Sequence, residues 1–410
     1  YLAGAITTHG GYILLDGTGG VISGTTITPG SITNGAVYQN ATINTTTTGT
    51  TTLTSTTTGG NVAIAASISV DDSCGAFEQG PGAIIYAGGS FSAKVSASGA
   101  GPIAFIVNSA SSSSPITAVG NLSIIGTSST TNPRFGGTIT ISSAIRSITG
   151  NINLSATNAS GTNIAAVQSS STGTITADNG SVTISGTATG TYQGVWIAST
   201  IAANSITVNA NSATASTVAT LSAMTINTCT TSCAGRDISI TANNTSAGGN
   251  TGISQSGNIA QNANGGSITF ISNNAINQAG AISLVANTSG TASSVTYDTT
   301  SGNSASTITA GALTVSATPT ASNTAINYIE ITNGASITTS GAISMPGYIN
   351  LDMTKVGTVA ASASTSANGI TLGGNLTSGA YAGTTGINIA GLSTTGTAVQ
   401  LGAYSLANGA

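Results

Sequence analysis

The chain of 410 residues carries only 5 basic and 9 acidic side chains, so its formal net charge is −4 and charged residues make up 3% of it. An ordinary soluble domain has about 25% charged residues. Nucleic-acid binding needs a cluster of basic side chains, which five cations spread over 410 positions cannot form, so we expect no nucleic-acid partner.

The composition predicts an all-β protein. Apolar residues make up 39% of the chain, which is enough to build a core and argues against disorder. The β-formers Ile, Val and Thr recur throughout, whereas the helix formers Glu, Lys and Arg are nearly absent. Because no apolar run approaches the length of a transmembrane helix, we expect no membrane-spanning segment. The chain starts at Tyr1 without a basic leader, so we expect it to be processed or to be a piece of a longer chain.

Residues 1–120 are interpreted as an irregular N-terminal β region that continues into the repeats that follow it. This region includes a Thr-rich run, Thr45–Thr58, which is predicted to be a polar strand pair or a loop. It also holds the one acidic cluster of the sequence, Asp71-Asp72 with Glu78 nearby. Glycoside hydrolysis needs two carboxylates facing a common bond, but neighbours on a strand point in opposite directions, so a solvated loop is favoured over a catalytic pair.

Residues 121–410 contain a repeated motif in which an aliphatic residue, a Ser, Thr or Asn and a second apolar residue follow each other. The first apolar positions are Ile152, Val182, Ile206, Ile238, Ile282, Leu313 and Ile343. Their sequence numbers differ by 30, 24, 32, 44, 31 and 30, so the dominant period is close to 30. Two stretches, 137–150 and 267–280, do not fit this spacing and are expected to be an added strand or a protrusion.

Each period is predicted to hold three short strands separated by turn-forming Gly, Asn, Ser and Thr. The second strands are placed at Ile164, Val195, Val218, Ile253, Val295 and Ile326, and the third strands at Ile175, Ile201, Ile226, Ile259, Ile308 and Ile337. A unit of this size cannot bury its own apolar face and must stack on the next copy. We therefore predict a parallel β-helix solenoid with about three strands per coil, since an antiparallel sandwich would not explain the period.

Two inward columns of aliphatic residues follow from this register. The first column holds the seven positions given above, and the second holds Leu154, Ile184, Val208, Ile240, Leu284, Val315 and Met345. In this register Ile206 and Ile238 are stacked neighbours.

The three cysteines suggest one covalent link. Cys229 and Cys233 enclose Thr-Thr-Ser, and in an oxidising compartment they are predicted to form a disulfide across a turn. Two free thiols are the main alternative, because a metal site would need further ligands and no His lies near. Cys74 has no evident partner and is either buried or paired with another chain.

Few single residues stand out as candidate site residues. Trp196 lies between Val195 and Ile197, so it is expected to point outward as a contact residue for a sugar or a partner surface, or to lie flat over its neighbours. His9, the only histidine, precedes Gly10-Gly11 and is expected to be exposed or hydrogen-bonded. We predict no catalytic residues, no cofactor and no metal site, and hence a protein that is not an enzyme.

The segments Gly180-Ser-Val-Thr-Ile-Ser-Gly186 and Gly265-Gly-Ser-Ile-Thr-Phe270 resemble the β-strand repeats of filamentous-haemagglutinin-like exoproteins and autotransporter passengers. The resemblance covers residues of about 120 to 390. These families are surface proteins of Gram-negative bacteria. The resemblance implies secretion to the cell surface and a right-handed β-helix displayed outside the cell.

Together these features favour an extracellular structural or adhesive protein that is part of a filament, fibre or layer. A nearly uncharged Ser, Thr and Asn surface offers little repulsion between copies, so self-association is expected, with surface glycans as further partners. The terminal strand-like pieces Tyr12–Leu15 and Thr397–Leu401 are expected to add edge pairing. The alternatives are a carbohydrate-active β-helix enzyme and an ice-binding solenoid. An ice-binding solenoid would need a Thr-x-Thr motif at the same position in every coil. The motif occurs singly, at Thr138-Ile-Thr140, Thr174-Ile-Thr176 and Thr307-Ile-Thr309, and does not recur in every coil.

Overall fold

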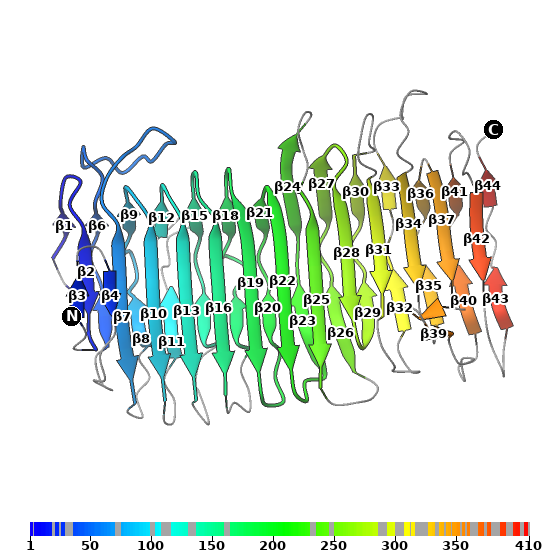
Figure 1. The fold of residues 1–410 in the computed structure, drawn as a ribbon, viewed down its shortest axis with the longest axis horizontal. Coiled ribbons are helices and arrows are strands. Elements are labelled where there is room, and N and C mark those ends of the chain that lie inside the picture. The colour runs from blue at the N-terminus through cyan, green and yellow to red at the C-terminus, as the bar shows by residue number, and fades with distance from the viewer. Residues whose placement is uncertain are drawn as a thin grey trace. The chain divides into compact units, whose positions relative to one another are not determined.

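The computed structural model describes residues 1–2, 4–18, 21–23, 26–28, 36–69, 75–98, 103–107, 116–129, 137–159, 165–229, 235–245, 250–285, 293–299, 307–311, 313–315, 327–332, 336–339, 342–345, 347–352, 355–356, 359–360, 368–372, 375–378, 386–390, 397–401 and 406–408. In these ranges every regular element is a β-strand (Figure 1). The strands form three parallel sheets, here called A, B and C, in which every coil contributes about one strand to each sheet. The predicted parallel β-helix solenoid is confirmed.

Contacts divide the chain into two compact units, of which the first comprises residues 1–204 and 208–215. Its sheet A consists of β5 (Val37–Gln39), β8 (Gly75–Gln79), β11 (Ile103–Val107), β14 (Ile139–Ile141), β17 (Val167–Ser169) and β20 (Val195–Ile197). Its sheet B consists of β1 (Ile6–Thr7), β6 (Ile43–Asn44), β9 (Ile85–Ala87), β12 (Ile116–Ala118), β15 (Ile145–Ser147), β18 (Ile175–Ala177) and β21 (Ile201–Ala203). Its sheet C consists of β2 (Ile13–Asp16), β7 (Val62–Ile68), β10 (Phe91–Ala97), β13 (Leu122–Ser128), β16 (Ile152–Asn158) and β19 (Ser181–Ala188).

The second unit comprises residues 205–207 and 216–410. Its sheet A consists of β23 (Thr217–Leu221), β26 (Thr251–Gln255), β29 (Ala275–Gln278), β32 (Thr307–Ala310), β35 (Ser336–Thr339), β40 (Asn368–Leu372) and β43 (Thr397–Leu401). Its sheet B consists of β24 (Met224–Cys229), β27 (Ile259–Ala263), β30 (Ile282–Leu284), β33 (Leu313–Val315), β36 (Ile343–Met345), β41 (Leu376–Ser378) and β44 (Leu406–Asn408). Its sheet C consists of β25 (Ile238–Asn244), β28 (Ser267–Ser272), β31 (Ser294–Asp298), β34 (Asn327–Thr332), β37 (Gly347–Asp352) and β42 (Gly386–Ala390).

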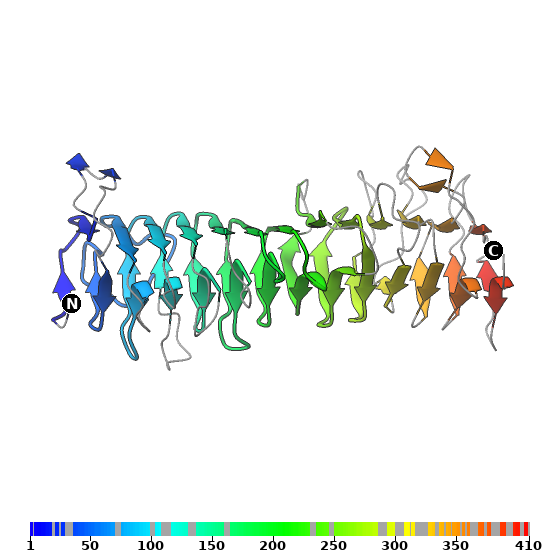
Figure 2. The same cartoon turned by 90° about the horizontal axis from the view of Figure 1, so that it is seen from below.

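Three further features complete the strands. Strand β22 (Ser205–Ser212) belongs to sheet C and contributes residues to both units. Two antiparallel pairs lie outside the three sheets, β3 (Val21–Ser23) with β4 (Thr26–Thr28), and β38 (Lys355–Val356) with β39 (Val359–Ala360). Within each unit, successive strands of a sheet lie side by side in both views (Figure 2).

Each strand pairs with its equivalent one coil further along the chain. In sheet C of the first unit, Phe91 lies opposite Leu122, Leu122 opposite Ile152, and Ile152 opposite Val182. The distances in sequence between these partners confirm the predicted period. The stacking of Ile206 on Ile238 is also as predicted, because the backbone N–H of Ile206 donates to the carbonyl oxygen of Asp237 at 2.9 Å.

Strand pleating sorts the side chains between the core and the outer surface. In β16, Ile152 and Leu154 are fully buried, whereas Asn153 is exposed and Ser155 is half-buried. The alternation follows from the two-residue period of a β-strand, which turns successive side chains to opposite faces. Aromatic residues join the same core, where the rings of Phe77 and Phe105 stack at 4.9 Å.

The predicted columns are right in the first unit, where Ile152 and Leu154 lie opposite Val182 and Ile184, and in the second unit for Ile206 and Ile238; they are wrong after Ile238 and Ile240. Beyond β25 the sheet C column continues through Ile268 and Val295. The remaining predicted members lie in sheet B instead, where Ile282 stacks between Ile259 and Leu313. The members that the structure places in sheet B are Ile282, Leu284, Leu313, Val315, Ile343 and Met345. The motif is the same in strands of both sheets, so its spacing could not assign a strand to its sheet.

The two stretches that broke the spacing are ordinary parts of coils, which corrects the expectation of an added strand or protrusion. Residues 137–150 hold β14 and β15, and residues 267–280 hold β28 and β29.

Because the motif does not show to which sheet a strand belongs, three predicted strands were assigned to the wrong sheet. Val295 lies in sheet C, and Ile308 and Ile337 lie in sheet A. Ile164 and Ile326 lie outside the described residues.

Polar side chains at the start of the sheet C strands link consecutive coils. The side-chain oxygen of Asn121 accepts the backbone N–H of Asn151, and that of Asn151 accepts the N–H of Ser181, both at 2.8 Å. In the second unit, Asp237 Oδ1 accepts both the N–H and the hydroxyl of Ser267, at 2.8 and 2.7 Å. These bonds satisfy backbone donors at the corners, where the strand ladders end.

The corners also bring successive backbones into close approach. A Cβ added to Gly180 would overlap the carbonyl oxygen of Gly150 one coil earlier. In the second unit, a Cβ on Gly280 would overlap the carbonyl oxygen of Gly257 in the same way. Glycine is therefore required at these corners for steric reasons.

Burial of a charge in the core tests the corrected column. Ile240 is fully buried and lies opposite Phe270, whose ring stacks on Tyr297 at 4.8 Å. We expect Ile240→Asp to lower the free energy of unfolding by about 3–5 kcal/mol, because it places an unpaired charge between coils. The outward neighbour Ser239, changed to Asp, is the matched control and should melt like the wild type. Equal melting temperatures for the two variants would contradict the assignment.

Substitution at a corner tests the close approach of the backbones. We expect Gly180→Ala to destabilise the protein by about 1–3 kcal/mol, since the new methyl group meets backbone that cannot rotate away. Gly4→Ala is the control, because nothing lies within 4 Å of a Cβ at Gly4. Chemical denaturation of both variants gives the comparison, and a Gly180→Ala protein as stable as Gly4→Ala would show that the corner is looser than described.

Candidate functional site

The outer face of sheet C in the first unit carries rows of polar side chains. Because the strands pair in register, outward residues line up from coil to coil. One row contains Ser92, Ser123, Asn153 and Thr183, and another contains Ser67, Ser96, Thr127, Thr157 and Thr187. Between them lies a mixed row of Lys94, Ile125, Ser155 and Ser185. The result is a repeating surface of hydroxyl and amide groups.

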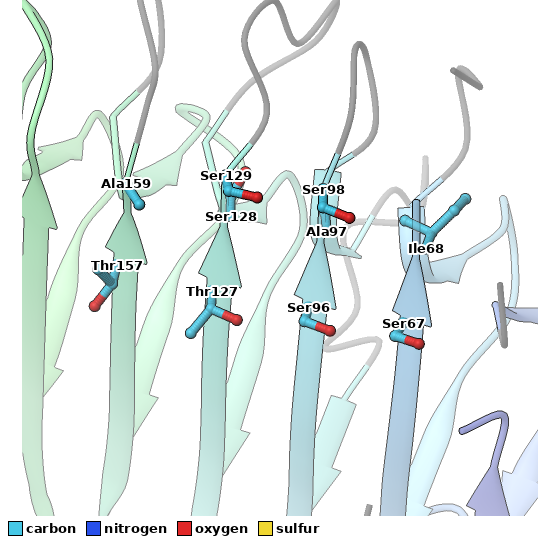
Figure 3. Close-up of a pocket in the computed structure, with 10 residues that line it drawn as sticks. All are labelled: Ser67, Ile68, Ser96, Ala97, Ser98, Thr127, Ser128, Ser129, Thr157 and Ala159. Atoms are coloured by element: carbon cyan, nitrogen blue, oxygen red, sulfur yellow. The ribbon is translucent and has the colours of Figure 1, made fainter. Parts of the chain in front are cut away.

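A groove of about 320 Å³ runs across the ends of four of these strands, β7, β10, β13 and β16 (Figure 3). Its lining residues are Ser67, Ile68, Ser96, Ala97, Ser98, Thr127, Ser128, Ser129, Thr157 and Ala159. Figure 3 shows Ser67, Ser96, Thr127 and Thr157 at one level of their strands, and the residues at and just after the strand ends at a second level. The groove is therefore built from equivalent positions that recur in successive coils.

The chemistry of the groove is neutral. No charged side chain is among the described residues that line it. Within the described ranges, the hydroxyl groups of Ser96, Thr127 and Thr157 make no hydrogen bond to another residue. A hydroxyl both donates and accepts, so this surface can form hydrogen bonds with the donors and with the acceptors of a neutral polar partner.

The same pattern recurs on sheet C of the second unit. There Ser239 lies opposite Thr269, and Thr269 lies opposite Thr296. Further along the sheet, Asn388 Nδ2 donates to Asn350 Oδ1 at 2.7 Å across adjacent coils. Glu330 is the register partner of both Thr296 and Asn350, so the polar row of the second unit includes an ionisable residue.

The Thr-rich run forms a loop with internal hydrogen bonds rather than a regular strand pair. Thr46 makes an isolated antiparallel bridge to Gly59, and the Thr47 hydroxyl donates to the carbonyl oxygen of Thr58 at 2.8 Å. Thr138 and Thr140, candidates for an ice-binding face, are both buried. This Thr-x-Thr pair therefore does not contribute to an exposed array.

Trp196 lies on the outer face of β20 with 44% of its surface exposed, while Val195 and Ile197 point into the core, as the alternation predicted.

His9 is exposed in a turn, with a φ of 51°. Cys229 ends β24, but Cys233 and Cys74 lie outside the described residues, so the disulfide stays a prediction. Asp71 and Asp72 also lie outside them.

Described carboxylates make local contacts in the solenoid. Asp178 binds Arg146 of the preceding coil, with Nη2–Oδ2 at 2.6 Å and Nε at 3.1 Å from both carboxylate oxygens. Asp16 accepts from the N–H and the hydroxyl of Thr18. Together with Asp237, these residues connect coils or close turns.

Within the described ranges, no cluster of three or more His, Cys, Asp or Glu residues could hold a metal ion. No helix with the length and apolarity needed to cross a membrane occurs among the described residues.

Comparisons with protein-family models, with curated proteins and with solved structures found no match.

The groove residues were missed in the sequence. The signal that marks them is the regular spacing of Ser67, Ser96, Thr127 and Thr157, whose sequence numbers differ by 29, 31 and 30. Ser and Thr are so frequent in this chain that the spacing becomes informative only once the strand register is known.

A buried polar chain in the second unit was also missed. The Tyr297 hydroxyl donates to Gln278 Oε1 at 2.8 Å, and Gln278 Nε2 donates to Gln255 Oε1 at 3.1 Å. The backbone N–H of Gly311 adds a second donor to Gln278 Oε1 at 2.7 Å. Complete burial raises the pKa of Tyr297 far above its ordinary value, because the phenolate would lose its hydration.

This shift predicts a loss of stability at high pH. The pKa of Tyr297 is raised in the folded state, so its contribution is fully present below the unfolded value of about 10 and is lost as the pH rises above it. One unit above that value, the wild type should lose about 1 kcal/mol more than Tyr297→Phe, which cannot ionise. Urea unfolding of both proteins on either side of pH 10 measures the difference, and parallel decreases would contradict it.

Proposed function

We propose that this chain is an extracellular structural or adhesive β-solenoid that serves as a subunit or segment of a surface filament, fibre or layer. The observation that carries the proposal is the set of in-register hydroxyl and amide rows on the outer face of sheet C, which includes the groove. The resemblance of the repeats to secreted surface proteins supports the same compartment.

The polar face suits contact with a second copy of the chain. Because a hydroxyl both donates and accepts, rows of Ser and Thr such as Thr127, Thr157 and Thr187 are complementary to themselves. Each such contact contributes only about 0.5–1.5 kcal/mol. A repeating surface offers many of them at once, so affinity comes from number rather than from a single strong site.

Electrostatics favours the same mode of association. The chain has a net charge of −4 over 410 residues, so copies repel each other weakly. Few ion pairs are available to hold an interface together, and association should therefore respond little to salt. These properties fit close lateral packing of like surfaces.

Introduced charges on the polar face test the proposal. Purified wild-type protein should associate with rising concentration in analytical ultracentrifugation, almost independently of ionic strength. The triple variant Thr157→Lys, Thr183→Lys, Ser185→Lys should be monomeric at low salt and regain part of its association at high salt, because screening weakens the repulsion.

A control separates this surface from others. The triple variant Thr176→Lys, Ala202→Lys, Ala260→Lys places the same charge on the outer side of sheet B, and it should associate like the wild type. Negative-stain imaging should show filaments or lateral clusters in the samples that associate. A wild type that is monomeric at every concentration, or a triple variant that associates like the wild type, would contradict the proposal.

A further inference from the structure

Trp196 lies on the outer face of sheet A. Its neighbours Val195 and Ile197 are 0% and 1% exposed, so the strand is anchored on both sides of Trp196. With 44% of its surface exposed, part of this side chain is open to solvent.

An amide group lies next to this ring. Gln168 of β17 is the register partner of Trp196, one interstrand step of about 4.8 Å away. Gln168 is half-buried, and within the described chain its amide has no hydrogen-bond partner. Its carbonyl oxygen accepts and its NH₂ group donates, so both kinds of hydrogen bond are available beside the ring.

The outward row is covered on the far side of Gln168. Gly137 lies beside Gln168, where a Cβ would come within 3.1 Å of the Gln168 Cβ. Thr140, the next member of the outward row, is buried, and its hydroxyl accepts the backbone N–H of Gly137. The accessible part of this stretch of the row therefore consists of Gln168, which is half-buried, and the exposed Trp196.

We propose that Trp196 and Gln168 form a binding site for a neutral pyranose ring of a glycan chain. A pyranose has an apolar face of C–H groups and a rim of hydroxyls. The first packs on an indole face and the second bonds to an amide, so the pair matches both parts of the sugar.

The composition of the row decides between partners. An apolar protein segment would need further exposed apolar residues around the ring, but the register partner of Trp196 on β17 is the amide residue Gln168. A charged sugar would need an ionic partner, and the ionisable member of this row, Glu78, is separated from Trp196 by Ile106, Thr140 and Gln168. A neutral sugar fits both facts. This site lies on sheet A and does not depend on the self-association proposed for sheet C.

The single tryptophan makes a direct test. The full chain is titrated with cellohexaose, maltohexaose, xylohexaose and chitohexaose while tryptophan emission is followed. We expect a saturable blue shift with at least one probe, because the sugar excludes water from the indole. Gln168→Ala should weaken binding about threefold to tenfold, through loss of its hydrogen bonds. Thr176→Ala, on sheet B, should leave binding unchanged.

Affinity electrophoresis in gels that contain the matching polysaccharide gives a second readout. Trp196→Ala should lose its retardation, while Trp196→Phe, which keeps an aromatic face, should retain part of it. Thermal unfolding identifies whether each variant is folded. No emission change with any probe, or retardation that survives in Trp196→Ala, would overturn the proposal. Self-association of sheet C is measured separately by ultracentrifugation, so failure of one proposal can be told from failure of the other.

Discussion

The parallel pairing of each strand with its equivalent one coil later is the constraint on which the rest of the structure depends. It fixes the distance between coils at the spacing of a β-ladder, about 4.8 Å. At that spacing the backbones of Gly150 and Gly180 have no room for a side chain between them, which is why glycine is found at Gly180. It also leaves corner N–H groups that need acceptors, and the side chains of Asn121, Asn151 and Asp237 supply them.

The same pairing creates two repeating surfaces from one alternation. Inward residues such as Ile152 and Val182 stack into aliphatic columns, and their outward neighbours Asn153 and Thr183 stack into polar rows. Burial of the aliphatic columns stabilises the fold and fixes the strand register. The same register places the outward polar side chains in regular rows. The groove and the aromatic position on β20 are therefore both products of register, since each depends on which residues the ladder brings into line.

The sequence was sufficient for the class of fold, because a regular period combined with alternating apolar positions leaves few other architectures. It was insufficient for assigning strands to sheets. Ile282 and Ile268 occur in nearly identical short motifs, yet one lies in sheet B and the other in sheet C. The outward position of Trp196 followed from alternation alone. The groove could not be found that way, because its Ser and Thr residues come from four coils and become neighbours only through tertiary pairing.

The contacts between Asn121, Asn151 and Ser181 repeat at intervals of 30 residues. Each contact joins one coil only to the next, so the pattern has no favoured total length. Duplication of the coil between Asn121 and Asn151 would therefore give the copied asparagine an equivalent partner in the next coil. An insertion of one or two residues within a strand would instead shift the ladder and turn its core residues to solvent. We therefore expect the gain or loss of a whole repeat to disturb this fold less than the insertion of one or two residues within a strand.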